Sequence, residues 1–299
     1  MKENMNTINT TKYINMLESN SKFSIILVEQ YDNECIEFNI MRKSNNKQVS
    51  YFYIHTHDVI TNEKLDNTVY EIYYDNDDNE DDDFWIGFEQ EYFIRSAHNK
   101  DVLGFERGGS VDPQGKYYCG VGNGQVNGRE FVDRHMENCI EAGIEITGTN
   151  AEVLLGQWEY QVFSKGSQKA GDDLWMSRYF LYKIAEDYGY HIELHPKPIT
   201  HGEWNGSGLH TNFSTDKMRE EGGESYFMSI FNAFESRHKE HISVYGSNNH
   251  LRLTGEYETQ AIDKFSWGVS DRGASIRVPK DTAKEWKGYV EDRRPGSNA

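Results

Sequence analysis

An acidic run divides this chain. Seven of the nine residues from 75 to 83, DNDDNEDDD, are Asp or Glu. A block of like charges repels itself and is poorly suited to an apolar core, so it favours a solvated connector over a cation-binding tract. The run therefore predicts a boundary between a small domain at residues 1–83, with the acidic linker at 75–83, and a larger domain at residues 84–299.

The two sides of this boundary differ in pattern. Before it come strand-like runs rich in β-branched and aromatic residues, FSIILVEQ, CIEFNIMRK, VSYFYIHT and TVYEIYY. After it come three segments with a helical spacing of apolar residues, GREFVDRHMENCIEAG, GDDLWMSRYFLYKIAEDYGY and GGESYFMSIFNAFESRHKEHI. We expect the first helix to end at Gly143 and the third to span residues 222–242. The second should start at Asp172 or Asp173 and end near Gly189.

The strands between these helices do not follow a regular βαβ rhythm. This order of elements predicts the α+β class: a curved, mainly antiparallel sheet with helices packed on one side. A small antiparallel β unit precedes it.

Composition is typical of a folded globular protein. The chain has 299 residues, of which 36% are hydrophobic and 13% aromatic, enough for a sizeable core. No apolar run approaches the roughly 20 residues of a membrane span, and the N-terminus, MKENMNTINTTKYINMLESN, lacks the apolar region of a secretory signal. Three cysteines without CxxC spacing are too few for a disulfide framework. The net charge of −18 argues against nucleic acid or an anionic membrane as the main partner. We expect a cytoplasmic protein.

One stretch raises an electrostatic question. TNAEVLLGQWEYQ, Thr149–Gln161, predicts two short strands that meet in a two-residue turn at Leu155 and Gly156. In that register Glu152 lies directly across from Glu159. Like charges that face each other destabilise a sheet, so this pair needs an explanation.

A second pair of carboxylates lies in IGFEQEYF. Side chains alternate along a strand, so Glu89 and Glu91 share one face and Gln90 lies on the other. A solvated strand face would explain an ExE pattern by itself, but the bulky apolar residues on both sides favour a strand inside the fold. Buried charges cost several kcal/mol unless they are paired or bound to metal.

A glycine-rich turn opens the segment WNGSGLHTNFS. Asn205 and Gly206 would let the backbone approach a small substrate closely. The strand that follows places His210, Asn212 and Ser214 on one face. A lone histidine is more often structural than a ligand. This segment therefore indicates a binding site only in combination with the other motifs.

Arginines gather toward the end of the sequence. GYVEDRRPGSNA aims Glu291 and Arg293 the same way, and Arg252, Arg272 and Arg277 precede them. Surface ion pairs would explain each arginine singly. Together, the carboxylates, the histidine and the arginines predict a site for hard divalent cations such as Mg²⁺ or Mn²⁺ and for phosphate. GGSVDPQGKYY lacks Walker A spacing, so a nucleotide must be held in another way.

In their order, these segments resemble the eukaryotic-type glutamine synthetase family. From about Phe84 to Ala299 the resemblance rests on GFEQEY, DPQGKYYCGVG, GREFVDRHMENCIEAGIEITGTNAEVLLGQWEYQV, GDDLWMSRY, PKPI, WNGSGLHTNFST, RLTGEYET, SWGVSDRGASIRVP and KGYVEDRRP. It implies ATP-dependent ligation of ammonia to L-glutamate through γ-glutamyl phosphate, which yields L-glutamine, ADP and phosphate. The corresponding process would be glutamine biosynthesis in nitrogen metabolism.

The resemblance also implies metal and substrate residues. One divalent ion, Mg²⁺ or Mn²⁺, would be held by Glu91, Glu152 and Glu159, and a second by Glu89, His210 and Glu291. L-Glutamate would be bound by Asn205, Gly206, Arg252 and Arg293. The catalytic set would comprise Arg272 and Arg277, which stabilise the phosphoryl group, and Glu258, on a flap that closes over glutamate and helps to bind ammonium.

ATP would contact three short stretches in addition to Arg272 and Arg277. They comprise Glu159, Tyr160, Gln161, Val162, Phe163 and Ser164, then Asn212, Phe213 and Ser214, then Tyr289, Val290 and Glu291. Because this family builds its sites between adjacent subunits, the resemblance implies a homo-oligomeric ring.

Two features depart from the family pattern. The N-terminal domain of the family is a small β-grasp unit whose loop, W-N-F-D-G-S-S, brings an acidic residue into a neighbouring site. Residues 1–83 lack that motif, so we expect a reduced, divergent β-grasp-like domain. The chain ends four residues after Pro295, without the C-terminal helices usual in the family. The alternative to an active ligase is a catalytically impaired paralogue that binds nucleotide or glutamate and acts as a regulator; a ligase for another amine is a third reading.

Overall fold

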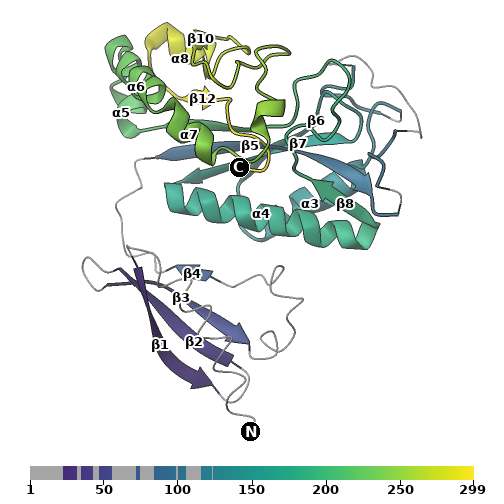
Figure 1. Cartoon of the computed structure of the whole chain (residues 1–299), viewed down its shortest axis with the longest axis vertical. Helices are drawn as coiled ribbons and strands as arrows, with labels where there is room; N and C mark the ends of the chain where they lie inside the picture. Colours follow the sequence, from purple (N-terminus) through teal and green to yellow (C-terminus); the bar gives the residue numbers. More distant parts are fainter. Residues whose placement is uncertain are drawn as a thin grey trace. The chain divides into compact units, whose positions relative to one another are not determined.

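The computed structural model divides the chain into two compact units, Met1–Asn79 and Glu80–Ala299 (Figure 1). Of the first unit, the structure describes the backbone of four strands; of the second, it describes residues 84–98, 100–105, 116–122 and 124–299. The acidic run at 75–83 and the PQG stretch before residue 116 lie outside the described residues. The domain type of each of the two units stays a prediction.

The strands of the first unit are β1 (Phe23–Tyr31), β2 (Cys35–Arg42), β3 (Lys47–His55) and β4 (Ile72–Tyr74). They pair antiparallel in the order β1-β2-β3-β4. The β-grasp-like character of this unit stays a prediction.

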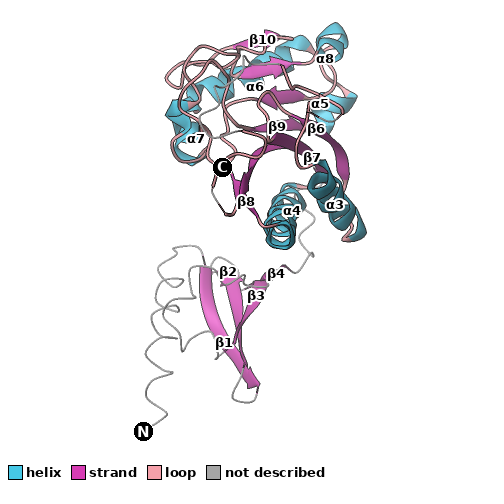
Figure 2. Cartoon of the chain, turned by 90° about the vertical axis from the view of Figure 1, so that its right-hand side faces the viewer, coloured by secondary structure: helices cyan, strands magenta, loops and turns pink. Residues whose placement is uncertain are grey.

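The second unit is built on an eight-stranded sheet. Its strands are β5 (Trp85–Ser96), β6 (Ile146–Ala151), β7 (Gln157–Lys165), β8 (Tyr190–Glu193), β9 (Leu209–Ser214), β10 (Trp267–Val269), β11 (Ile276–Val278) and β12 (Val290–Asp292). Their order is β10-β11-β12-β9-β5-β7-β6, and β8 also pairs with β5. Only β10 and β11 run parallel among these pairs, and the sheet curves (Figure 2). A largely antiparallel sheet flanked by helices confirms the predicted α+β class.

The helices of the second unit are α3 (Arg129–Glu141), α4 (Ser167–Tyr188), α5 (Asp216–Glu220), α6 (Glu224–Ser236), α7 (His238–Val244) and α8 (Lys280–Glu285), with a 3₁₀ turn at Asn249–Leu251. The predicted stops are confirmed: Gly143, at φ 83°, follows α3, and Gly189, at φ 64°, ends α4. Both adopt the left-handed conformation that glycine tolerates best.

Two helix predictions were wrong. The start of α4 is not Asp172 or Asp173, because the helix already begins at Ser167, after Gly166. Asp173 is buried inside it and accepts hydrogen bonds from Ser164 Oγ and Lys169 Nζ. Asp173 therefore satisfies side chains rather than the helix start. The third predicted helix is divided into α6 and α7, because Arg237 leaves helical geometry at φ −104° and ψ 11°.

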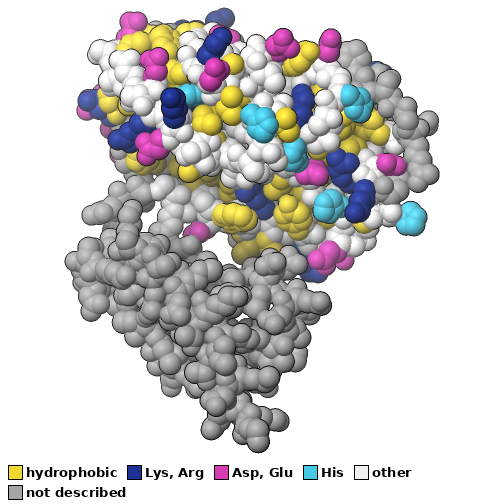
Figure 3. Space-filling model, in the orientation of Figure 1, with side chains coloured by type: hydrophobic (Ala, Val, Ile, Leu, Met, Phe, Trp, Pro, Cys, Tyr) yellow, Lys and Arg dark blue, Asp and Glu magenta, His cyan; other side chains and the backbone are white. Residues whose placement is uncertain are grey.

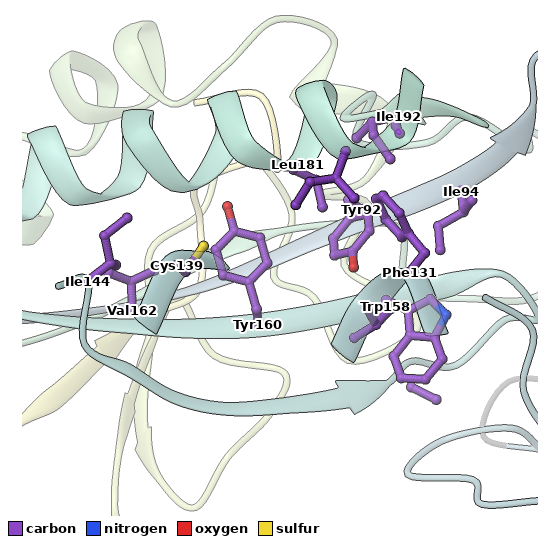
Figure 4. Close-up of a cluster of buried hydrophobic side chains, with 14 residues drawn as sticks. Tyr92, Ile94, Phe131, Cys139, Ile144, Trp158, Tyr160, Val162, Leu181 and Ile192 are labelled. Carbon is purple, nitrogen blue, oxygen red and sulfur yellow. The ribbon is translucent and has the colours of Figure 1, made fainter. Parts of the chain in front are cut away.

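The core lies between one face of the sheet and the helices. Tyr92 of β5 and Tyr160 of β7 pack with Phe131 of α3 and Leu181 of α4 (Figure 4). A second cluster joins α5 and α6 to β11 and β12. Because strand side chains alternate, the other face of β5, β7, β9 and β12 stays clear of these helices.

The surface of the second unit carries charges of both signs. On the face shown in Figure 3, Lys and Arg side chains are interspersed with Asp and Glu rather than gathered in one patch. Among the described residues, no helix is both long and apolar enough to cross a membrane.

A buried histidine ties together α3, α4 and β7. His135 Nε2 lies 2.9 Å from the carbonyl oxygen of Ser177 and 3.3 Å from Cys139 Sγ, and its ring packs edge-on against Tyr160. Its Nδ1 is buried without a hydrogen-bond partner in the described part of the chain. Burial lowers the pKa of His135 from 6.5 to about 4 because the core solvates the imidazolium poorly.

This histidine predicts acid sensitivity. The folded state takes up the proton at lower pH than the unfolded state, so stability falls as pH drops from 6.5 toward 4. Between about pH 7 and about pH 4.5 the loss should be roughly 2–3 kcal/mol. Chemical unfolding of the wild type and of His135→Gln at both pH values measures it. The variant should lose less stability over this interval; an identical loss would exclude His135 as its source.

Candidate functional site

Six potential metal ligands gather on the sheet face opposite the helices. They form two groups, Glu91, Glu152 and Glu159 and Glu89, His210 and Glu291, and within each group the ligand atoms lie within 4.8 Å of one another. Strand order explains the gathering: β12, β9, β5 and β7 are successive neighbours, and β6 follows. Residues far apart in sequence thus become adjacent.

The first group rests on a cross-strand pair. Glu91 of β5 lies directly opposite Glu159 of β7. The predicted register of the next hairpin was wrong, because Glu159 faces Asn150 and not Glu152. Residues 152–156 form a loop between β6 and β7 in place of the expected two-residue turn.

The loop nevertheless brings Glu152 to the same place. The true register is offset by two residues from the predicted one, and an even offset keeps side chains on the same face. The backbone N–H of Glu152 donates to the carbonyl of Gln157, 2.9 Å away. Asn150 Nδ2 and the Val153 N–H donate to the Glu152 carboxylate at 3.2 and 3.1 Å. These bonds fix the carboxylate beside its two partners.

The three carboxylates are buried together, which opposes their ionisation. Burial raises the pKa of Glu91 to about 7. Burial first, and then the neighbouring carboxylates, hold the pKa of Glu152 and of Glu159 well above the usual range. Gln157 Nε2 and the Gly208 N–H donate to Glu91 Oε2 at 3.1 and 3.0 Å. A hard divalent cation fits this all-oxygen donor set, because it removes the repulsion.

The second group combines nitrogen and oxygen donors. His210 Nδ1 lies 3.3 Å from Glu89 Oε2 and 3.5 Å from Glu291 Oε1. Burial, with a further contribution from Arg293, holds the pKa of His210 well below its usual range, so the imidazole is neutral. Asn212 Nδ2 donates to Glu89 Oε1 at 2.7 Å. A neutral imidazole beside two carboxylates is a suitable ligand set for a divalent ion.

Three of the four predicted arginines contact this second group. Arg277 Nη1 and Arg293 Nη1 lie 2.9 and 2.6 Å from the two oxygens of Glu291. Arg252 is buried, donates to the carbonyl of Arg293 at 3.0 Å and lies 2.9 Å from His210 Nε2. Arg272 is farther out and donates to the carboxylate of Glu258 at 3.4 Å.

The contact with Arg252 defines the tautomer of His210. A guanidinium only donates, so Nε2 must accept and the single proton of the neutral ring sits on Nδ1. That proton points toward Glu89. A cation that bound Nδ1 would require the proton to move to Nε2 and Arg252 to withdraw from it.

The predicted glutamate-binding turn is tightly packed. Gly206 has φ 86°, and a Cβ there would lie 2.7 Å from the Pro196 carbonyl oxygen and 2.8 Å from Arg252 Cγ. Glycine is therefore required both by conformation and by space. Asn205 Oδ1 is buried, and the described part of the chain offers it no hydrogen-bond donor. An acceptor of this kind suits an amine or ammonium group of a ligand.

A cavity of about 320 Å³ opens beside Glu89. It is lined by seven of the predicted nucleotide-contacting residues, Gln161, Val162, Phe163, Asn212, Phe213, Ser214 and Tyr289. Sequence reasoning missed Trp85, Gly87, Phe88 and Thr147, which also line it. Trp85 and Gly87 share the face of β5 with Glu89, so the period-2 alternation that located Glu89 could have found them.

Other predicted nucleotide-contacting side chains do not reach this cavity. Tyr160 and Ser164 face α4 and bond to Ser177 and Asp173, while Val290 is buried in the cluster with α5 and α6. Glu159 and Glu291 belong to the two metal-type groups instead. The predicted stretches thus contain both cavity-lining and core-facing residues.

Glu258 stands apart, on the surface. Tyr257 and Glu258 both have left-handed backbone, with φ 52° and 62°, which costs free energy for non-glycine residues. Arg272, which contacts Glu258, also donates to Tyr118 Oη at 3.4 Å. Glu258 therefore reaches the site through Arg272 and not through either group of metal-type ligands.

The back of β5 is held by a network that the sequence analysis did not identify. Gln90, between Glu89 and Glu91, points to the helix face, where its Oε1 accepts from Arg178 Nε and Nη2 at 2.8 and 2.6 Å. Arg178, on α4, also donates to the carbonyls of Ser297 and Ala299. The strand that carries both groups is thus anchored from behind.

Comparison with known proteins agrees with this geometry. Residues 67–299 match the family model described as glutamine synthetase, catalytic domain. The glutamine synthetase of Tuber borchii is 54% identical over 215 residues, which cover 72% of this chain and 60% of the relative. That of Schizosaccharomyces pombe is 52% identical over 218 residues, 73% and 60% of the two chains.

The glutamine synthetase of Saccharomyces cerevisiae is 50% identical over 218 residues, which cover 73% of this chain and 58% of the relative. The chain therefore spans about 60% of the length of the curated relatives it matches. The family model covers well over half of this chain, and the six gathered ligands and the arginines lie inside the matched region. The chain belongs to the glutamine synthetase family.

Proposed function

We propose that this protein ligates ammonia to L-glutamate at the expense of ATP, forming L-glutamine through γ-glutamyl phosphate. One observation carries the proposal: two groups of metal-type ligands lie side by side on one sheet face, joined through Glu89 and Glu91 of a single strand. Phosphoryl transfer needs cations and arginines to offset the negative charge of the phosphates. The site offers ligands for both ions and arginines beside them.

In this proposal Mg²⁺ or Mn²⁺ occupies both groups. Bound divalent ions would neutralise the carboxylates and polarise the phosphoryl group. Glu91, Glu152 and Glu159 would hold one ion, and Glu89, His210 and Glu291 the other. The donor chemistry supports this, because the first set is all carboxylate and the second retains a neutral imidazole.

The cavity beside Glu89 would receive ATP. Trp85, Phe163, Phe213 and Tyr289 supply aromatic surface on which a purine can pack. Glu89 lines the same cavity and belongs to the second group of ligands, so the phosphates would extend toward that group. Arg277 lies beside the group through Glu291 and would act on the phosphoryl group together with Arg272.

L-Glutamate would bind at the Asn205–Gly206 turn. Asn205 Oδ1 is a buried acceptor suited to an α-ammonium group, while Arg252 and Arg293 supply positive charge for carboxylates. Glu258, on its strained segment, would close over the substrate and attract ammonium, since a carboxylate favours a cation. Closure would also protect an acyl phosphate from water.

We further propose cytoplasmic localisation and a homo-oligomeric ring with sites between subunits. These proposals rest on family membership and on the expectations drawn from composition. A catalytically impaired regulator that binds nucleotide or glutamate remains the alternative function, and it predicts binding without turnover.

The central prediction concerns catalysis. Purified protein mixed with ATP, Mg²⁺, L-glutamate and hydroxylamine should form γ-glutamyl hydroxamate, because hydroxylamine substitutes for ammonia in attacking the acyl phosphate. Colorimetric detection of the hydroxamate measures it, and reactions without ATP or without Mg²⁺ are the controls. Nucleotide binding by calorimetry without any hydroxamate would favour the regulator.

A second prediction concerns the first group of ligands. Glu159→Gln should weaken divalent-ion binding by at least about tenfold and abolish turnover, because it removes an ionised ligand. Without metal the variant should be at least as stable as the wild type, since burial and the neighbouring carboxylates disfavour the ionised form of Glu159. Mn²⁺ titration and chemical unfolding measure the two effects.

Glu186→Gln is the matched control, because Glu186 is exposed on α4 and pairs only with Lys183 in the described region. It should leave both quantities within error of the wild type. If Glu159→Gln were more stable than the wild type but bound ions unchanged, Glu91, Glu152 and Glu159 would be a destabilising cluster of like charges and not a metal site.

A further inference from the structure

The PKPI motif contains a lysine that belongs to none of the predicted site residues. Its lysine, Lys197, is half-buried and lies over the face of Trp204, with Nζ 4.3 Å from the ring centroid. The same Nζ donates to the carbonyl oxygen of Trp204. Trp204 immediately precedes the Asn205–Gly206 turn, so Lys197 holds the start of the proposed glutamate-binding loop.

The residue before Lys197 supports the same turn. The Pro196 carbonyl accepts from the Ser207 N–H at 2.8 Å and leaves no room for a side chain at Gly206. The indole of Trp204 is fully buried against Phe93, Val153 and Leu154. The last two belong to the loop that carries Glu152, so the turn is tied to the first group of ligands as well.

On its other side Lys197 approaches the segment of Glu258. Nζ lies 5.9 Å from the ring centroid of Tyr257, within the range of a cation–π contact. Tyr257 is one of the two residues with left-handed backbone there. A strained backbone conformation persists only where the surrounding contacts hold it.

The half-burial of the Lys197 ammonium costs free energy, which indicates a functional role for this position. Burial, and then the charge of Arg252, lower the pKa of Lys197 to about 8. In the described part of the chain its recorded partners are a carbonyl and two aromatic rings, and no ion pair with a carboxylate compensates it. A half-buried cation without a counterion is retained where its position matters, or where an anionic ligand completes the site.

We propose that Lys197 is a positioning residue for glutamate: its ammonium joins the Trp204–Gly206 turn to Tyr257, and thereby holds the binding turn and the Glu258 segment in register around the amino acid. This inference rests on the proposed function of the site. It adds a role for a residue that contacts none of the metal-type ligands.

Binding measurements test the inference without turnover. Calorimetry of L-glutamate is performed on the full chain with Mg²⁺ and a non-hydrolysable ATP analogue, and the affinity for the analogue is measured separately. Lys197→Met should weaken glutamate binding by about tenfold or more and change analogue affinity by less than about twofold. Lys197→Arg should recover most of the loss, because a guanidinium also stacks on aromatic rings.

Two further variants make the outcome decisive. Tyr257→Leu removes the other end of the contact at an exposed position, so it should fold and should weaken glutamate binding by about threefold or more. Lys183→Met, at an exposed lysine on α4, is the control and should change neither affinity.

Unchanged glutamate affinity in both Lys197→Met and Tyr257→Leu would overturn this inference but leave the proposed function intact. Equal losses for glutamate and for the nucleotide analogue would also overturn it, because they would indicate a general structural role. If the wild type bound the analogue but no glutamate, the proposed function would fail, and with it the need for a positioning residue.

Discussion

The concentration of like charge on one sheet face governs the rest of this structure. Glu91 and Glu159 face each other across two strands, with Glu152 beside them, and all three are buried. Each is stabilised as a carboxylate only by hydrogen bonds, distant arginines or a bound cation. A central strand held on both edges, a fixed loop and anchoring from the helix face are what keep these groups from separating.

Much of the fold followed from local patterns. Alternation along IGFEQEYF correctly separated Glu89 and Glu91 from Gln90, since the two faces of β5 meet different surroundings. Glycine stops after α3 and α4 were equally readable. The start of α4 was not predictable in this way. Aspartate is a common N-cap residue, but Asp173 accepts hydrogen bonds from Ser164 and Lys169 instead of capping the helix. Side-chain competition of this kind depends on tertiary contacts.

The site was predictable as a set of residues, less so as a geometry. The wrong hairpin register still placed Glu152 on the right face, because the error was even. By contrast, the contacts of Gln90 with Arg178 and of Lys197 with Trp204 and Tyr257 join distant segments through side-chain ends. No periodicity encodes such contacts. Within Glu159–Ser164, Gln161, Val162 and Phe163 line the cavity, whereas Tyr160 and Ser164 bond to residues of α4. Alternation does not separate the two sets, because Val162 has the same parity as Tyr160.

The position of Arg252 has a thermodynamic consequence. It bonds to His210 Nε2 while also belonging to the proposed glutamate-binding set. A cation that takes His210 Nδ1 must displace this guanidinium, and an anion that attracts the guanidinium must release the imidazole. Binding of the cation and binding of the anion would therefore be coupled thermodynamically through Arg252. Each must alter the affinity of the other by the same factor, whichever arrives first.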